Sequence, residues 1–418
     1  MNKIDDLKVR KIKQKFDDTV IENIPEYIEE AFKASDIKDR INSGDRIALT
    51  VGSRGISDIE TIAREVIVNL KKTGAVPFII PAMGSHGGAT PSGQKEILKS
   101  YGITEKSMEV PIEASMKTVK IGEVEGVPIY FSQKAIQADG IIALNRIKMH
   151  TDFHGKIESG MSKVMVIGLG KHRGAQSIHS RGVYGLKELI PQAAELIINK
   201  APVIQGIGLV ENGYEDIMEI SFTPPEKILE KDSELLKLAA DKMPSLPVDK
   251  IDVAVVQKIG KDISGSGMDT NVIGRLYING EKEFSSPDIK RLVVMDLTES
   301  SHGNAIGIGL ADITTQKLVD KIDYKDTYEN TITSSFLRRS KIPVTVESEK
   351  EAVKLALDTC WLLPDQIPGM IIMKNTLELE ELYVTRPIWD RINTDELKEW
   401  GEWEQVTFDN NGNLQPVL

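Results

Sequence analysis

Histidine is concentrated in one part of this 418-residue chain. Five of the six histidines fall between residues 86 and 179, each near a glycine-rich turn: His86, His150, His154, His172 and His179. Imidazole changes its protonation near neutral pH and is the side chain that most often binds metals. The clustering therefore indicates acid–base catalysis or metal binding within this segment.

A glycine-rich loop carries the first of these histidines. The segment MGSHGGATPSG, residues 83–93, follows an expected strand and leads into a helix that begins at Pro91, with Thr90 as its N-cap. Backbone N–H groups of such a loop can bind a phosphate or a carboxylate. His86 stands at the apex, where an α/β sheet is expected to place a catalytic side chain.

The preceding strand ends in a similar loop, VGSRGISD, residues 51–58. Arg54 lies between Ser53 and Gly55 and is expected at the carboxyl end of that strand. A guanidinium offers two parallel donors to a carboxylate or phosphate, which lysine cannot reproduce. Arg54 is therefore a candidate for binding an anionic substrate.

The densest run of reactive side chains is KMHTDFHGKIESGMSK, residues 148–163. On a helix, His150 and His154 would share one face and could bind a metal together. The Thr-Asp-Phe and Gly residues around them are poor helix formers, so a loop is expected instead. Lys163, which follows a Ser-Gly turn, is a candidate phosphate contact or nucleophile.

Several common catalytic motifs are absent. No Gly-x-x-x-x-Gly-Lys-Ser/Thr phosphate loop is found, and GSGMDTNVIG, from Gly265, does not match the dinucleotide fingerprint. A Gly-x-Ser-x-Gly elbow is missing, which argues against a serine hydrolase. The single cysteine, Cys360, excludes an intrachain disulfide and a cysteine-based zinc site.

Charge and hydropathy exclude further classes of protein. The formal net charge of −11 argues against binding to nucleic acid, which needs a basic surface. No run of 18 apolar residues and no apolar leader are found, so we expect no membrane span and a cytoplasmic location.

Alternating strand and helix patterns predict an α/β fold in two domains. Strands are expected in the first half at 46–51, 76–81, 140–144 and 203–210, and in the second half at 251–256, 292–297 and 370–373. The stretch MPSLPVD separates the halves, so the predicted domains are residues 1–248 and 249–418. The tail, about residues 400–418, has a strand-like pattern that could pack back on the first domain.

Five segments, taken in order, resemble the nickel-pincer nucleotide-dependent lactate racemase family, and most closely its less characterised branch of 2-hydroxy acid isomerases. They are VGSRGISD, PAMGSHGGATPSGQ, NRIKMHTDFHGKIESGMSKVMVIGLGK, IGKDISGSGMDTNVIGR and DLTESSHGNAIGIGLADITT. Each segment is weak alone, but the five in this order are specific and span nearly the whole chain.

The resemblance implies two α/β domains with the active site in the cleft between them. It also implies a cofactor, the pyridinium-3,5-bisthiocarboxylic acid mononucleotide, which holds nickel through two sulfurs and a ring carbon. By resemblance, His179 completes the square plane of the metal, and Lys163 contacts or covalently attaches the cofactor. Partner proteins would synthesise this nucleotide.

The resemblance further assigns the acid and base to His86 and His150, with His154 as the second choice. Arg54 would bind the substrate carboxylate. The best-known racemases of the family also use a lysine to bind the substrate, and this sequence has no clean match to that lysine after Ile259. Lys261, or else Arg275, would take its place. Other expected cofactor contacts are Ser53, Gly87, Gly88 and Gly160.

The expected function is therefore a racemase or epimerase of a 2-hydroxy acid that works by hydride transfer. Two alternatives stay open. One is a zinc-dependent hydrolase that uses His86, His150 and His154 with an acid such as Asp152. The other is a non-catalytic protein that binds the nucleotide cofactor.

Overall fold

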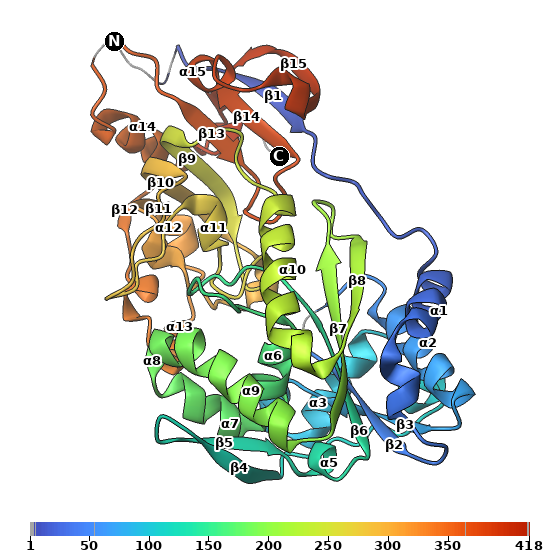
Figure 1. Ribbon diagram of the computed structural model, residues 1–418. Helices are drawn as coiled ribbons and strands as arrows, with labels where there is room; N and C mark the ends of the chain where they lie inside the picture. Colours follow the sequence, from blue (N-terminus) through green and yellow to red (C-terminus); the bar gives the residue numbers. More distant parts are fainter. Residues whose placement is uncertain (1–3, 5, 54, 364, 416–417) are drawn as a thin grey trace. The chain divides into compact units, whose positions relative to one another are not determined.

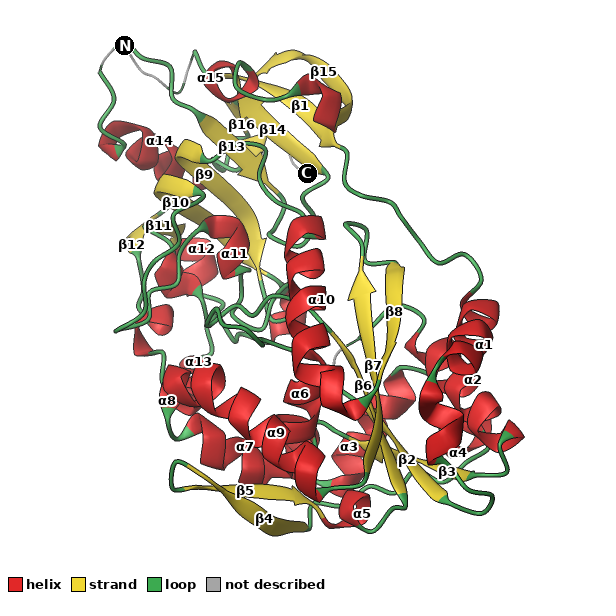
Figure 2. Ribbon diagram, in the orientation of Figure 1, coloured by secondary structure: helices red, strands yellow, loops and turns green. Residues whose placement is uncertain are grey.

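The computed structural model describes residues 4, 6–53, 55–363, 365–415 and 418. It divides into two compact units, residues 17–243 and residues 1–16 with 244–418, which we call the first and the second unit. Both units interleave helices with strands (Figure 2), which confirms the predicted α/β class. Among the described residues, no helix is long and apolar enough to cross a membrane.

The first unit is built on a five-stranded sheet with the strand order β3-β2-β6-β7-β8 (Figure 1). Its strands are β2 (Arg46–Val51), β3 (Val76–Pro81), β6 (Gly140–Arg146), β7 (Val203–Glu211) and β8 (Ile217–Thr223). The first four are parallel, and β8 runs antiparallel to β7. Their near-continuous apolar runs are typical of parallel strands that are buried on both faces.

Helices cover both faces of this sheet and enclose two apolar cores. Alternate residues of one strand enter different cores, as Ile47 and Ala48 of β2 do, because successive side chains point to opposite faces. One core contains residues of α1 (Ile24–Ala34), α2 (Ile59–Lys72), α3 (Pro91–Ser100) and α4 (Glu105–Met108). The other contains residues of α6 (Gly160–Lys163), α7 (Lys171–His179), α9 (Ile190–Lys200) and α10 (Ile228–Lys242).

Smaller elements complete the first unit. An antiparallel hairpin, β4 (Thr118–Val124) and β5 (Val127–Ser132), packs against α7 and α9. The remaining short helices are α5 (Gln133–Ile136) and α8 (Gly182–Tyr184).

The sheet has a topological switch point between β2 and β6. The chain passes from β2 through α2 to β3 on one side of β2, whereas β6 and β7 lie on the other side. In open α/β sheets, ligands bind outside the carboxyl ends of the strands at such a point. The loops that leave β2, β3 and β6 therefore meet at the edge where a site is expected.

The second unit contains an eight-stranded sheet with the order β12-β11-β10-β9-β13-β14-β1-β15. Its strands are β1 (Lys8–Gln14), β9 (Lys250–Ile259), β10 (Asp288–Leu297), β11 (Ile313–Thr315), β12 (Val344–Val346), β13 (Met370–Met373), β14 (Glu381–Thr385) and β15 (Leu397–Gln405). A two-stranded sheet, β16 (Thr407–Phe408) and β17 (Leu414–Gln415), follows it. The helices are α11 (Thr270–Ile273), α12 (Gln316–Val319), α13 (Tyr324–Ser334), α14 (Glu349–Thr359) and α15 (Arg386–Trp389).

The two ends of the chain differ from the sequence expectation, which assigned residues 1–16 to the first domain and had the tail pack back on that domain. Strand β1 lies between β14 and β15 in the second unit, with Val9 opposite Thr385 on one side and Glu404 on the other. The second unit resumes at residue 244 rather than 249. Val9 and Glu404 are nearly 400 residues apart in the sequence, and their pairing depends on tertiary packing. The local hydrophobic pattern of each strand does not predict which strand it pairs with.

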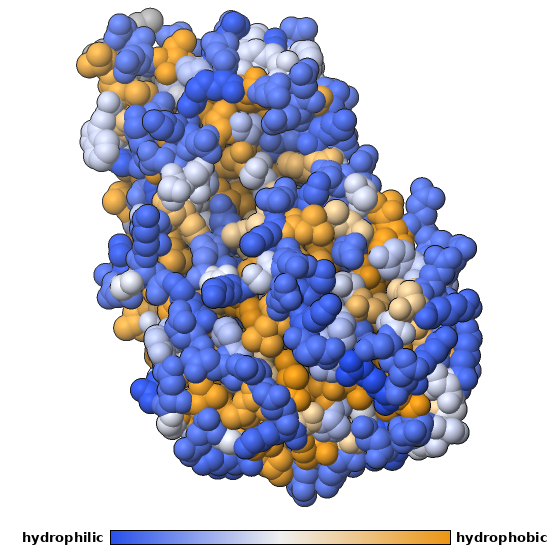
Figure 3. All heavy atoms as spheres, viewed as in Figure 1, coloured by the Kyte–Doolittle hydropathy of each residue, from blue (hydrophilic) through white to orange (hydrophobic). Residues whose placement is uncertain are grey.

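On the face shown in Figure 3, hydrophilic side chains predominate and hydrophobic ones are scattered among them. Such scattering is normal for a protein surface.

Candidate functional site

Ser53 and His86 meet at the carboxyl edge of the first unit's sheet. Ser53 follows β2, His86 follows β3, and Ser53 Oγ forms a hydrogen bond with His86 Nδ1. The hydroxyl of Tyr101 donates to the Ser53 carbonyl at 2.6 Å. Two of the residues nominated from sequence are thus brought together. Arg54, which follows Ser53, lies outside the described residues.

The glycines of the His86 loop are needed for its conformation. Gly87 and Gly88 have φ values of 67° and 61°, in the left-handed region that favours glycine. A Cβ on Gly87 would lie 2.5 Å from the carbonyl carbon of Gly93, so the loop packs directly on the first turn of α3. Thr90 caps that helix as predicted, because its Oγ1 accepts the Gly93 N–H at 3.1 Å.

A buried lysine and a glutamine hold the loop that carries His86. Lys171 is fully buried, and its Nζ donates to the Pro81 carbonyl and to Gln94 Oε1. Gln94 Nε2 donates in turn to the carbonyls of Gly84 (3.2 Å) and His86 (3.4 Å). Burial lowers the pKa of Lys171 to about 8. Sequence analysis missed this residue, because nothing in the local pattern separates a buried lysine from an exposed one.

The loop after β6 is organised by one buried carboxylate. Residues 147–159 form no helix, as predicted, and Glu158 is only 3% exposed. Glu158 Oε2 accepts the backbone N–H of His150 at 2.7 Å. Its Oε1 accepts the backbone N–H of Gly155 and lies 3.0 Å from His154 Nδ1. Sequence analysis gave Glu158 no role.

His150 has further contacts within the same loop. Its Nδ1 accepts the backbone N–H of Asp152 at 3.0 Å and lies 3.8 Å from Asp152 Oδ2. Its ring packs on Phe153 with the centroids 4.6 Å apart. These contacts fix both the position and the orientation of the imidazole.

Lys163 belongs to the same cluster. Its Nζ donates to the Glu158 carbonyl at 3.0 Å and lies 5.4 Å from the centroid of the Phe153 ring. Lys163 is the last residue of α6, so the start of that helix decides where its amine lies.

The start of α6 is held by Asp232 of α10. The carboxylate accepts the backbone N–H groups of Met161 (3.0 Å) and Ser162 (2.7 Å). Burial raises the pKa of Asp232 to about 6, against the lowering effect of these hydrogen bonds. Gly160 has a φ of 87°, and a Cβ there would lie 2.3 Å from Asp232 Oδ1, so packing alone already requires glycine at this position.

The Asn145 side chain and one backbone hydrogen bond join these groups at one edge. A Cβ on Gly52 would lie 3.1 Å from Asn145 Oδ1, and Asn145 Nδ2 donates to the Gly160 carbonyl at 3.1 Å. The Gly84 N–H donates to the Gly168 carbonyl at 3.2 Å. The ends of β2, β3 and β6 are therefore connected to the helical segment that carries Lys163.

His179 is the last residue of α7, and its side chain is exposed. The pKa of His179 is lowered, first by desolvation from the surrounding protein and then by the positive charge of Lys163, while Asp152 acts in the opposite direction. A lowered pKa favours the neutral imidazole, which is the form that binds metals.

Both expected substrate cations belong to the second unit, and each has contacts within that unit. Lys261 Nζ donates to the Gly265 carbonyl (2.6 Å) and to Asn330 Oδ1 (2.9 Å). Arg275, the other candidate, is buried in the same unit and pairs with Asp312 at 2.7 Å. These contacts give Arg275 a structural role.

No group of three or more His, Cys, Asp or Glu side chains with metal-binding geometry occurs in the part of the chain that the structure describes. A zinc hydrolase needs three protein ligands for its metal. His86, His150, His154 and Asp152 do not form that set, although all four are described.

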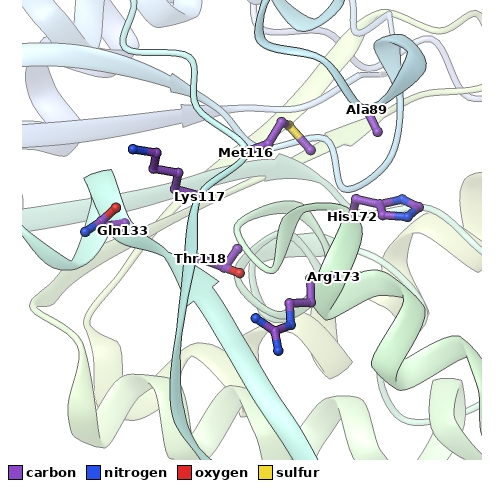
Figure 4. A pocket seen from close by; sticks show the side chains of 7 residues that line it. All are labelled: Ala89, Met116, Lys117, Thr118, Gln133, His172 and Arg173. Carbon is purple, nitrogen blue, oxygen red and sulfur yellow. The ribbon is translucent and has the colours of Figure 1, made fainter.

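A pocket of about 480 Å³ lies beside the His86 loop, between Ala89, the start of β4 and the first residues of α7. Figure 4 shows Lys117 and Gln133 extending to one side of it and His172 to the other. Its polar groups therefore do not converge on one point, and of the five clustered histidines only His172 lines it.

Comparisons with known proteins found a matching family model and similar solved structures. Residues 3–188 match the family model of the lactate racemase N-terminal domain. The lactate racemase apoprotein from Thermoanaerobacterium thermosaccharolyticum is similar in structure, with a TM-score of 0.54 at 13% identity, over 88% of this chain and 99% of that one. A crystal structure of a protein from Thermotoga maritima gives a TM-score of 0.53 at 13% identity, over 85% and 97%. No curated protein sequence matches significantly.

Proposed function

We propose that this chain, whose residues 3–188 match the family model of the lactate racemase N-terminal domain, interconverts the stereoisomers of a 2-hydroxy acid by hydride transfer. The match supports a racemase or epimerase type of function in general. The observation that carries the specific proposal is the gathering of Ser53, His86 and the Glu158-centred loop at the sheet's switch point. Ligands of open α/β sheets bind at such an edge.

The residues at this edge fit a nickel-pincer nucleotide. One neutral imidazole is the single protein ligand needed when the cofactor itself supplies two sulfurs and a carbon, and His179 has the lowered pKa that suits this role. Lys163, whose charge acts on His179, would contact the cofactor or attach it covalently. When bound, the cofactor supplies an acceptor and donor of hydride.

The proton steps fall to the protein's own side chains. The α-proton of a 2-hydroxy acid is very weakly acidic, so removing hydride avoids a carbanion beside the carboxylate. One histidine takes the hydroxyl proton as the Cα–H bond breaks, and a planar 2-keto acid forms. After hydride returns to the opposite face, the other histidine returns a proton to the oxygen. Imidazole suits both tasks near neutral pH, and such assistance contributes about 10²–10⁴-fold.

His86 and a histidine of the 148–159 loop are proposed for these two tasks, with His150 as the first choice and His154 as the second. The hydrogen bond between Ser53 Oγ and His86 Nδ1 occupies that ring nitrogen, so Nε2 is the proposed atom for proton exchange. Arg54 is proposed to bind the substrate carboxylate, and Lys261 to contribute from the second unit.

The test is to produce the protein together with the proteins that make the cofactor, and then to measure its nickel content, its visible absorbance and its turnover. Chiral chromatography would follow a panel of 2-hydroxy acids and sugar acids. We expect bound nickel, a chromophore and interconversion of at least one substrate. Nickel and chromophore without turnover across the panel would favour a non-catalytic cofactor-binding protein.

A further inference from the structure

One residue, Glu158, contacts three of the candidate site residues. Its side-chain carboxylate accepts the backbone N–H of His150 and contacts His154 Nδ1, and its backbone carbonyl accepts a hydrogen bond from Lys163 Nζ. Glu158 is 3% exposed, and a buried carboxylate is stable only when its oxygens are hydrogen-bonded. Glu158 therefore couples the position of all three residues.

The contact with Glu158 decides which nitrogen of His154 carries the proton. The two backbone N–H groups that point at this carboxylate can only donate, so its oxygens act as acceptors. His154 Nδ1, 3.0 Å from Oε1, must then donate as well. In neutral His154 the proton lies on Nδ1, and Nε2 holds the basic lone pair.

The contacts of His150 impose the opposite tautomer. The backbone N–H of Asp152 donates to His150 Nδ1 at 3.0 Å, so this nitrogen is the acceptor. In neutral His150 the proton therefore lies on Nε2, which makes Nε2 a hydrogen-bond donor. Two histidines four residues apart are thus set for opposite tasks by hydrogen bonds inside their own loop.

We propose that Glu158 is a positioning residue that holds His154 as the proton acceptor of this loop, while His150 donates a hydrogen bond from Nε2 to the substrate oxygen. The inference rests on the proposed function and resolves the choice between the two loop histidines. The hydroxyl proton of the substrate moves to His154 Nε2, and the Nδ1–H bond to Glu158 then stabilises the imidazolium that forms. When hydride returns to the opposite face and the hydroxyl is regenerated, His86, the other histidine of the pair, supplies the proton to the oxygen.

The direct test reads the tautomers in the full chain without cofactor. Nitrogen-15 NMR of histidine-labelled protein separates protonated from unprotonated ring nitrogens, and His150→Gln and His154→Gln assign the signals. We expect a protonated Nδ1 in His154 and a protonated Nε2 in His150. Glu158→Ala should shift His154 toward the Nε2–H form. A wild-type His154 with its proton on Nε2 would overturn the inference, whether or not the protein is an enzyme.

The second test measures the activity of the cofactor-loaded protein. Glu158→Gln keeps the size of the side chain but removes its charge, and we expect kcat to fall by about 10–100-fold with little change in KM. Glu195→Gln, an exposed charge removal on α9, is the matched control and should leave kcat unchanged. Unchanged kcat in Glu158→Gln would overturn the positioning role. An inactive wild type that still has the expected tautomers would instead overturn the proposed function, and with it the catalytic part of the inference.

Discussion

Lys171 and Gln94 form a buried hydrogen bond of 3.3 Å between Nζ and Oε1, beneath the loop that carries His86. The Nε2 amide group of Gln94 donates hydrogen bonds to the carbonyls of Gly84 and His86 and so holds the loop in place. A lysine and a glutamine with no part in the chemistry therefore determine where one proposed catalytic histidine lies.

Replacing Gln94 by leucine should misplace this loop. The change leaves two carbonyl groups and the Lys171 ammonium without their amide partner, and each buried unsatisfied group costs about 1–3 kcal/mol. We expect a clear loss in the free energy of unfolding, measured with urea, and lower turnover. Gln192→Leu, at an exposed position on α9, should change stability by no more than about 0.5 kcal/mol. Equal losses of unfolding free energy in Gln94→Leu and Gln192→Leu would contradict the role of Gln94 in holding the His86 loop.

Lys171 should make stability depend on pH in the alkaline range. Its pKa is about 8 in the folded protein and is ordinarily 10.5, so between these values the unfolded chain binds the extra proton. Stability of the wild type relative to Lys171→Met should therefore rise from pH 8 toward pH 10, by at most about 1.4 kcal/mol per pH unit. Urea unfolding at a series of pH values measures this difference, and a flat difference would refute the assignment.

Asp232 should show the opposite trend at acidic pH. Its pKa is about 6 in the folded protein and is ordinarily 3.8, so the folded state keeps a proton that the unfolded chain releases. Stability of the wild type relative to Asp232→Asn should fall as pH rises from about 4 to 6, and then level off. Asp241→Asn, exposed on the same helix, is the control. A difference that rises with pH would contradict this prediction.

Nickel binding should depend on one end of α7. His179→Ala removes the proposed metal ligand at the last residue of the helix, whereas His172→Ala removes an exposed histidine two turns earlier. Because losing a group that only supports a ligand typically costs about 10–100-fold in affinity, losing the ligand itself should cost at least that. Elemental analysis of the loaded proteins should find nickel with His172→Ala and little with His179→Ala. The reverse result would move the metal ligand to His172.

The strands around the site are predictable from sequence because parallel strands buried on both faces are continuous apolar runs. The expected strands at 46–51, 76–81 and 370–373 coincide with β2, β3 and β13, and the expected strand at 203–210 ends one residue before β7 does. The partners of β1 were not predictable, since pairing between Val9 and Glu404 depends on tertiary packing rather than on local pattern.

The residue types of the candidate site are visible in the sequence, but the residues that support them are not. Histidines and glycines in loops after strands indicate where chemistry is placed, whereas Lys171 and Asp232 act through burial, which their own sequence neighbours do not reveal. Glu158 is intermediate. Its position in the loop was visible, but its three hydrogen-bond donors are known only once the loop is folded.

Isotope retention tests the central claim, hydride transfer, most directly. The cofactor-loaded protein would convert one enantiomer of its 2-hydroxy acid in D₂O, and proton NMR and mass spectrometry would follow the Cα position. Hydride that leaves and returns does not mix with solvent, so we predict that both enantiomers keep protium at Cα while the chiral ratio approaches equilibrium. Deuterium that enters Cα in step with racemisation would mean proton abstraction and would contradict the account.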